Sequence, residues 1–87
     1  MIKIFKYELH KTPIVGPIMQ VLDVQLQGGI PVMWALVNTE TNIKKVVDVQ
    51  MLWTGQVVPE DIMKEYTYMK TLQDNEGLVW HVFIKGV

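Results

Sequence analysis

Few side chains in this sequence have the types and spacing needed for catalysis or metal binding. Its 87 residues include no Cys, Ser or Arg, which excludes thiolate ligands, Cys and Ser nucleophiles, and guanidinium clamps on phosphate. His10 and His81 lie far apart, and no HxH, HxxxH or facial-triad spacing accompanies them. We therefore expect no metal site, no cofactor and no catalytic residues.

The remaining candidates for acid–base chemistry lack partners at a defined spacing. For His81, a packed imidazole bonded to the backbone is a simpler interpretation than a catalytic base, which normally has a paired carboxylate or nucleophile. Asp23 and Asp48 lie on the polar faces of two expected strands. They would form a carboxylate pair only if those strands were neighbours, and solvated surface acids are the simpler interpretation. We expect a protein that is not an enzyme, with a hydrolase using His81 or the carboxylate pair as the least favoured alternative.

The aromatic side chains are more suggestive of a binding site. A ring stacked on a nucleobase contributes about 1–3 kcal/mol per base, and nearby lysines could meet phosphates as point charges. In a small β domain, however, Trp and Tyr commonly fill the core or an interface, so both interpretations stay open. The rings concerned are Tyr7, Trp34, Trp53, Tyr66, Tyr68 and Trp80.

Composition limits the partners. A formal net charge of -1 with scattered lysines argues against a binder of nucleic acid polymers. The longest apolar run, Ile30 to Val37, is far shorter than the roughly 20 residues of a membrane span, so we expect no membrane partner and a cytoplasmic location. An apolar content of 49% leaves a small domain with apolar surface to cover, which favours a homo-oligomer.

The elements that must position these residues are strands. Thirteen Val and eight Ile against one Ala favour pleated segments, and turn residues divide the chain into short pieces. Gly28-Gly29 and Asp74 to Gly77 are expected hairpin turns, and Pro59-Glu60-Asp61 begins one short helical turn near residues 59–66. The expected strands are Ile2 to Leu9, Val21 to Gln27, Val32 to Val37, Lys45 to Trp53, Tyr66 to Leu72 and Leu78 to Lys85, with Pro13, Gly16 and Pro17 in a loop or irregular edge.

These segments predict a single domain over residues 1–87. Its class is mainly β, at most a β-rich α+β fold: a small antiparallel sheet of about six strands curled into a barrel or sandwich. On Val21 to Gln27 we expect Leu22, Val24 and Leu26 to face the core. Val32 to Val37 is apolar on both faces, so it should be a central strand or lie at a subunit contact.

Four stretches together resemble a family of small uncharacterised proteins encoded by tailed bacteriophages. They are Lys3 to Leu9 (KIFKYEL), Val24 to Val37 (VQLQGGIPVMWALV), Trp53 to Pro59 (WTGQVVP) and Leu78 to Phe83 (LVWHVF). The family pattern is I-Y-K-Y, then V-Q-x-x-x-G-x-x-x-x-W-A-L-V, T-G-x-x-I/V-P and L-V-x-H-V-F, and it covers nearly the whole chain. Phe5 replaces the usual Tyr, and Thr67 to Thr71 departs from the usual Y-I-G-T.

The resemblance implies a small accessory protein in the cytoplasm of the bacterial host, and such proteins often counter host immunity. We therefore expect a homo-oligomer that sequesters a nucleotide-derived signalling molecule of the cyclic ADP-ribose or cyclic dinucleotide class. A protein–protein inhibitor of a host defence or replication enzyme is the alternative. The expected ligand-binding residues are Lys6, Tyr7, Trp34, Trp53, Thr54, Gly55, His81 and Lys85.

Overall fold

The computed structural model describes residues 1–86, which form seven strands, one short α-helix and one 3-10 turn. The strands are β1 (Ile2–Glu8), β2 (Ile14–Gly16), β3 (Ile18–Gln27), β4 (Ile30–Asn38), β5 (Lys45–Trp53), β6 (Thr67–Gln73) and β7 (Val79–Lys85). The 3-10 turn, η1 (Leu9–Lys11), joins β1 to β2, and α1 (Glu60–Glu65) precedes β6.

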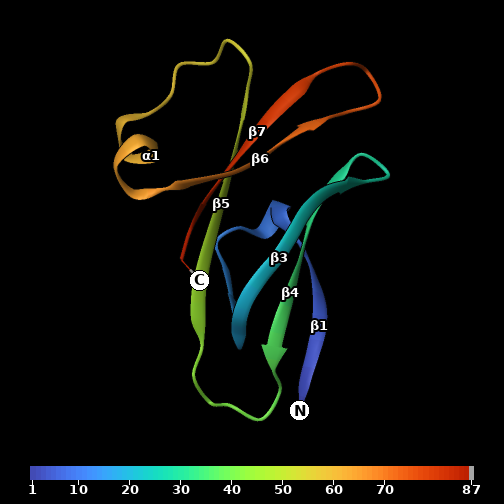
Figure 1. The fold of residues 1–87 in the computed structure, drawn as a ribbon, viewed down its shortest axis with the longest axis vertical. Coiled ribbons are helices and arrows are strands. Elements are labelled where there is room, and N and C mark those ends of the chain that lie inside the picture. Colours follow the sequence, from blue (N-terminus) through green and yellow to red (C-terminus); the bar gives the residue numbers. More distant parts are fainter. Residues whose placement is uncertain (87) are drawn as a thin grey trace.

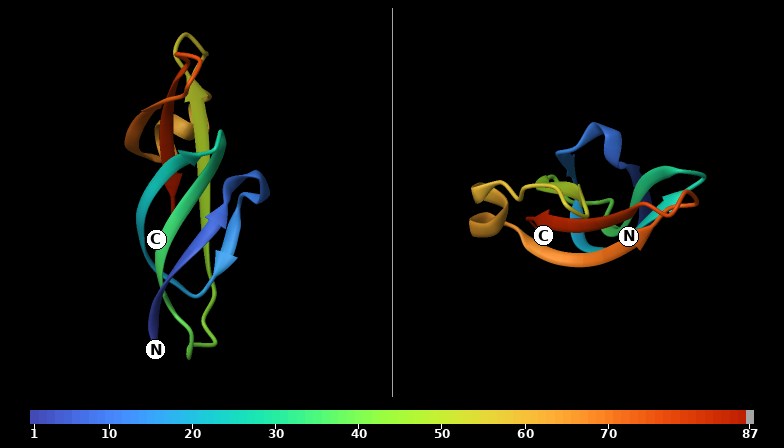
Figure 2. Two further views of the ribbon diagram at one scale, coloured as in Figure 1. Left: turned by 90° about the vertical axis from the view of Figure 1, so that its right-hand side faces the viewer. Right: turned by 90° about the horizontal axis from the view of Figure 1, so that it is seen from above.

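The strands form two antiparallel sheets that pack as an open sandwich (Figures 1 and 2). The first sheet has the order β1-β4-β3, and the second has the order β2-β5-β7-β6. The chain therefore changes sheet three times: between β1 and β2, between β2 and β3, and between β4 and β5. The molecule measures 42 × 31 × 18 Å, and the expected mainly β fold is confirmed as a sandwich rather than a closed barrel.

The core lies between the two sheets and is made of apolar side chains from both. Val24, Met33, Ala35, Val37, Val47 and Val82 are fully buried there. Alternation explains this set, because every second residue of a strand points to the same face. On β5, for example, Val47, Val49 and Met51 point inward, as their spacing predicts, whereas Trp53, expected on the same face, is 52% exposed at the end of the strand.

Most expected elements are confirmed with their boundaries close to those read from the sequence. Strand β5 spans the expected residues, and β4 is the central strand of its sheet. Gly28 and Gly29 have positive φ values of 58° and 81°, which a tight hairpin turn between β3 and β4 requires. The helical turn is confirmed at Glu60–Glu65, immediately after Pro59.

One local expectation is wrong, and another is made more precise. Strand β3 begins at Ile18, and its register against β4 shifts between Val21 and Asp23. A bulge of this kind changes the alternation, so Leu22 is exposed instead of facing the core. The irregular edge around Gly16 contains a seventh strand, β2, which pairs with the first residues of β5.

No helix in residues 1–86 is both long and apolar enough to cross a membrane.

Candidate ligand-binding site

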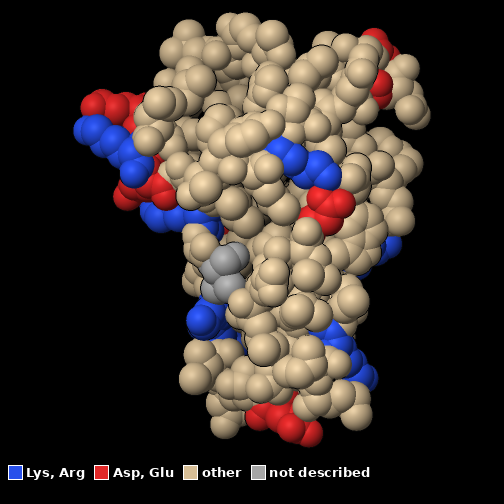
Figure 3. Space-filling model, viewed as in Figure 1, with Lys and Arg blue, Asp and Glu red and all other residues tan. Residues whose placement is uncertain are grey.

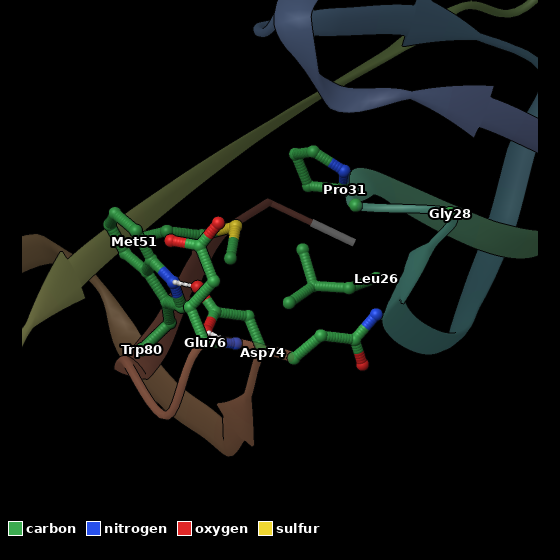
Figure 4. Close-up of a pocket in the computed structure, with 9 residues that line it drawn as sticks. Leu26, Gly28, Pro31, Met51, Asp74, Glu76 and Trp80 are labelled. Atoms are coloured by element: carbon green, nitrogen blue, oxygen red, sulfur yellow. Dashed lines mark hydrogen bonds between the residues drawn. The ribbon is translucent and has the colours of Figure 1, made fainter.

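A cleft of about 550 Å³ opens at the end of the sandwich where the β3–β4 turn faces the β6–β7 turn (Figure 4). Hereafter we call it the end cleft. One wall carries Leu26 and Pro31 from the first sheet, and the other carries Met51 and Trp80 from the second. Its remaining lining residues are Gly28, Gly29, Asp74, Asn75 and Glu76. The cleft is therefore apolar inside and acidic at its rim, and its volume is in the range of sites for small molecules.

Asp74 builds the acidic wall by organising its own turn. Its Oδ1 accepts hydrogen bonds from the backbone N–H groups of Glu76 and Leu78, both at 2.9 Å. Its Oδ2 accepts a 3.3 Å bond from Trp80 Nε1, drawn as a dashed line in Figure 4. Desolvation acts to raise the pKa of Asp74, but the bonds from Leu78, Trp80 and Glu76 outweigh it and lower the pKa below its ordinary value. The carboxylate thus fixes the orientation of the indole ring that lines the cleft.

Beside the end cleft, on the outer face of the second sheet, four side chains form a continuous hydrogen-bonded chain. His81 Nε2 lies 2.8 Å from Thr54 Oγ1, and His81 Nδ1 lies 3.1 Å from Thr71 Oγ1. Thr71 Oγ1 in turn lies 2.7 Å from Tyr68 Oη. Both imidazole nitrogens of His81 therefore have hydroxyl partners, and no carboxylate orients the ring. The sequence had suggested a His81 ring bonded to the backbone. The structure instead holds the ring through the hydroxyls of Thr54, after β5, and Thr71, on β6.

Half of the expected ligand-binding residues meet at this end of the second sheet. Trp53 is the last residue of β5, and Thr54 and Gly55 form the turn that follows it. The Trp53 ring packs edge-on against Trp80, with centroids 5.9 Å apart. His81 joins them through its bond to Thr54. None of these four residues lines the end cleft, and the Trp53–Trp80 ring contact connects the group to it.

The expected lysines do not join this group. Lys85 lies toward the other end of β7, where its Nζ is 3.5 Å from Glu65 and 5.7 Å from the centre of the Tyr66 ring. Lys6 is on β1 in the first sheet, and its Nζ donates a 2.9 Å bond to Gln27 Oε1. Because β4 lies between β1 and β3, this bond crosses β4 on the outer face of the sheet.

Tyr7 and Trp34 also lie in the first sheet. Tyr7 packs against the core, and burial raises its pKa. Trp34 is partly buried on the outer face, in register with Lys6 on one side and Asp23 on the other. The structure therefore does not bring Lys6, Tyr7 and Trp34 together with the Trp53–His81 group.

Asp23 and Asp48 do not form a carboxylate pair, because their strands belong to different sheets. Neither is simply solvated. Asp23 accepts a 2.6 Å bond from Lys70 Nζ, and this bond, together with those from Gln25 and Val24, lowers its pKa. Its ion pair with Lys70 joins β3 to β6 at one open side of the sandwich.

Asp48 is the centre of a second polar cluster. Its carboxylate accepts bonds from Thr12 Oγ1 at 2.7 Å, from Gln50 Nε2 at 3.0 Å and from the Tyr66 hydroxyl. Desolvation acts to raise the pKa of Asp48, but these bonds outweigh it and lower the pKa. The same contact raises the pKa of Tyr66 to about 12. The cluster ties the loop before β2 and the start of β6 to β5, which is a structural role.

The cleft-lining residues were missed, although both of the turns that carry them were recognised in the sequence. The cleft brings together residues from three separate parts of the sequence: Leu26 to Pro31, Met51, and Asp74 to Trp80. Their meeting depends on which strand ends lie opposite each other in the two sheets, and local patterns carry no such information. One local signal for Asp74 was available in the sequence. An Asp at the start of a turn, three residues before a Gly, commonly accepts hydrogen bonds from the backbone N–H groups that follow it.

The end cleft combines an aromatic ring, apolar walls and two carboxylates. An indole face and apolar walls suit a flat ring, and the carboxylates of Asp74 and Glu76 accept hydrogen bonds or attract a cation. In residues 1–86, no three His, Asp or Glu side chains are grouped as metal ligands would be.

No curated protein and no solved structure matches this chain in the comparisons. One family model does match, that of a domain of unknown function (DUF7352), and it spans residues 1–86. This span covers nearly the whole chain, including both sheets and the end cleft. The chain therefore belongs to the DUF7352 family.

Proposed function

We propose that this protein is a non-catalytic binding protein that takes a nucleotide-derived ligand by its base in the end cleft. The observation that carries the proposal is the combination, in one cleft, of an oriented indole ring and rim carboxylates. Stacking on an aromatic ring is available to every nucleobase and contributes about 1–3 kcal/mol.

The acidic rim defines which part of the ligand enters. The amino and imino groups on a base edge donate hydrogen bonds, and Glu76 and Asp74 are acceptors. Phosphate groups would be repelled by the same carboxylates. Figure 3 shows acidic side chains at the tip of the β6–β7 turn, without basic ones beside them on this face. The base therefore enters the cleft, and the phosphates stay in solvent.

The biological role that we propose follows the resemblance to bacteriophage proteins. A phage-encoded accessory protein in the host cytoplasm would withdraw a signalling nucleotide by holding it without altering it. The absence of Ser, Cys and Arg from the sequence supports binding over hydrolysis, since the usual nucleophiles are missing. Cyclic ADP-ribose derivatives and cyclic dinucleotides are the ligand classes to test first.

The test is a binding titration of the protein with cyclic ADP-ribose, cyclic dinucleotides, adenosine and guanosine, followed by tryptophan fluorescence and NMR. We expect at least one of these ligands to shift the resonances of Trp80 and of the β6–β7 turn. Mass spectrometry of the ligand released by heat should recover it unchanged. No binding by any of the four probes, or recovery of an altered ligand, would overturn the proposal.

Glu76→Gln tests the orientation of the ligand, because the Glu76 side chain makes no hydrogen bond within residues 1–86 and should not affect folding. If the base edge donates to Glu76, loss of the charge should weaken binding by about tenfold. If phosphates entered instead, the same substitution would tighten binding. Glu60→Gln on α1, where the carboxylate pairs only with Lys64, is the matched control and should leave affinity unchanged.

A second candidate function is docking onto a host protein. The segment between β5 and α1 exposes apolar side chains that the fold does not use: Val57 is 86% exposed and Met63 on α1 is 70% exposed. Such side chains are the usual anchors of protein–protein contacts. Capture of one defined host enzyme that is lost with Val57→Asp, combined with no nucleotide binding, would favour this candidate.

A further inference from the structure

Strand β1 lies at an open edge of the first sheet. The structure shows which of its main-chain N–H and C=O groups face β4 and which face the open edge. The Thr39 N–H donates to the Met1 carbonyl oxygen at 3.0 Å, so residue 1 turns its polar groups toward β4. The register of β1 against β4 has no shift from Ile2 to Glu8. Because N–H and C=O groups alternate sides along a strand, odd-numbered residues of β1 bond β4. The N–H and C=O groups of Ile2, Ile4, Lys6 and Glu8 therefore point to the open edge.

The other three edge strands of the sandwich are protected. Strand β2 has three residues and lies between Pro13 and Pro17. Strands β3 and β6 both contain register shifts, and the Asp23–Lys70 ion pair joins them. Short length, proline, bulges and charges are the ordinary means by which edges avoid pairing. Strand β1 is regular, has seven residues and contains no proline.

Strand β1 is also uncovered on both of its faces. Ile2 and Ile4, on the outer face, are 52% and 61% exposed, and Phe5, on the inner face, is 39% exposed. Tyr7 is its one half-buried residue. The facing sheet offers β1 little cover, because the short strand β2 forms its edge on this side (Figure 2). The Lys6 ammonium, which could guard the edge, is turned back across β4 to Gln27.

We propose that β1 pairs antiparallel with β1 of a second copy of this chain about a two-fold axis at Phe5. This register aligns Ile2–Glu8 with itself over its full length and makes one six-stranded sheet from two subunits. The even-numbered residues then form about eight backbone hydrogen bonds, two for each pair. Ile4 lies opposite Lys6 of the partner subunit, and Lys3 lies opposite Tyr7 of the partner subunit.

Charge selects this register over its neighbours. With the axis at Phe5, no two like charges lie directly opposite, and the phenyl rings of the two subunits meet on the axis. Moving the axis to Lys6 would bring the two Lys6 side chains against each other, which is unfavourable in a cross-strand pair. Moving it to Ile4 would pair only residues 2–6. An isologous contact of this kind closes at two chains and leaves no free β1 edge.

The first test is a charge-swap experiment at the axis, read by sedimentation equilibrium. The parent should be a dimer. Phe5→Glu and Phe5→Lys each bring like charges together and remove the ring pair, so each should raise the dimer dissociation constant by about tenfold or more. An equimolar mixture of the two variants should restore the dimer. Val57→Glu, at an exposed loop position, is the matched control and should leave the mass unchanged.

The second test is amide hydrogen exchange measured by NMR, and it does not depend on any variant. In a single subunit the amides of Lys3, Phe5 and Tyr7 are protected by β4, and those of Ile4 and Lys6 are free. Pairing through β1 protects Ile4 and Lys6 as well. A monomer at millimolar concentration, or a dimer in which these two amides exchange freely, overturns the proposal.

The pairing of two subunits through β1 does not depend on the nucleotide ligand that we propose for the end cleft. The end cleft is lined by residues of β3, β4, β5 and β7 and of the β3–β4 and β6–β7 turns, and none of its lining residues comes from β1. Loss of nucleotide binding with an intact dimer would therefore refute only the ligand, and a monomer that binds the nucleotide would refute only the pairing.

Discussion

The two sheets of this sandwich use their polar side chains differently. In the second sheet, Asp48, Asp74 and His81 each have at least two hydrogen-bonded partners, and these bonds tie loops and turns to strands. In the first sheet, the side chains that bond across strands or to the other sheet are mainly Lys6 with Gln27 and Asp23 with Lys70. The first sheet instead exposes apolar side chains along β1.

This difference separates two functions of a small domain. In the second sheet, Asp74 bonds Trp80 and holds its ring in place at the end cleft, so the ligand that we propose would bind there without the entropic cost of ordering this ring. Strand β1 exposes apolar side chains and has main-chain groups without partners in a single subunit, which is why we propose the first sheet as the surface for a second subunit. The following predictions test this division, beginning with the largest expected effect.

Asp48→Ala should be the most destabilising of these substitutions. It leaves the hydroxyls of Thr12 and Tyr66 and the amide of Gln50 without their acceptor. Because the site is partly exposed and water replaces some of these bonds, we expect the free energy of unfolding to fall by about 1–3 kcal/mol. Urea unfolding followed by circular dichroism measures it. Asp61→Ala, on the first turn of α1, is the control, and an equal loss there would contradict a special role for Asp48.

The Asp48 cluster should also make stability depend on alkaline pH. The pKa of Tyr66 is raised to about 12 from an ordinary value near 10. A raised folded-state pKa contributes stability that is complete below pH 10 and is lost as the pH rises toward 12. We expect the urea midpoint to fall over this interval, and Tyr66→Phe should remove that part of the fall. A Tyr68→Phe control should keep it.

Low pH should also lower the stability of the fold, through carboxylates in both sheets. The pKa values of Asp23, Asp48 and Asp74 are all lowered, so their contributions are present above about pH 4 and are lost as the pH falls through the lowered values. NMR titration of the three carboxylates gives the pKa values directly. A pKa above the ordinary value at any of the three would contradict the bonding described for that residue.

The ion pair between the sheets should contribute less than the Asp48 cluster. A double-mutant cycle of Asp23→Asn with Lys70→Met should give a coupling energy of about 0.5–1 kcal/mol, because both side chains are partly exposed. The coupling should decrease in high salt. A coupling energy larger than the loss of stability in Asp48→Ala would contradict the view that the Asp48 cluster contributes more to stability than the Asp23–Lys70 ion pair.

The smallest effect should come from the chain of hydroxyls around His81. Thr54→Val removes the partner of His81 Nε2 at an exposed site, where water can take its place. We expect a change within about 0.5 kcal/mol in the free energy of unfolding. A larger loss would show that this chain is a structural element of the second sheet comparable to Asp48.

The sequence predicts the strands well and the site poorly, for one physical reason. Alternation and turn residues are local, so β5, the Gly28-Gly29 turn and the helical turn after Pro59 could be located directly. The bulge at Leu22 could not, because it depends on how β3 fits β4. The end cleft could not either, since Leu26 and Trp80 meet only through the stacking of two sheets. Of the expected ligand-binding residues, Trp53, Thr54, Gly55 and His81 lie close together because β5 and β7 are neighbouring strands, and their role in binding stays a prediction.

The order of strands along the chain has a consequence for synthesis on the ribosome. Ile2 pairs with Asn38, and Ile14 pairs with Val47, so β1 and β2 are both made well before their partners. At about 5–20 residues per second, each waits for a few seconds with its main chain unpaired. Strand β2 finds its partner once β5 is made, and β5 finds its second partner once β7 is made. The first strand keeps one open side even then, so we expect that nascent chains on neighbouring ribosomes can begin to pair before either is complete.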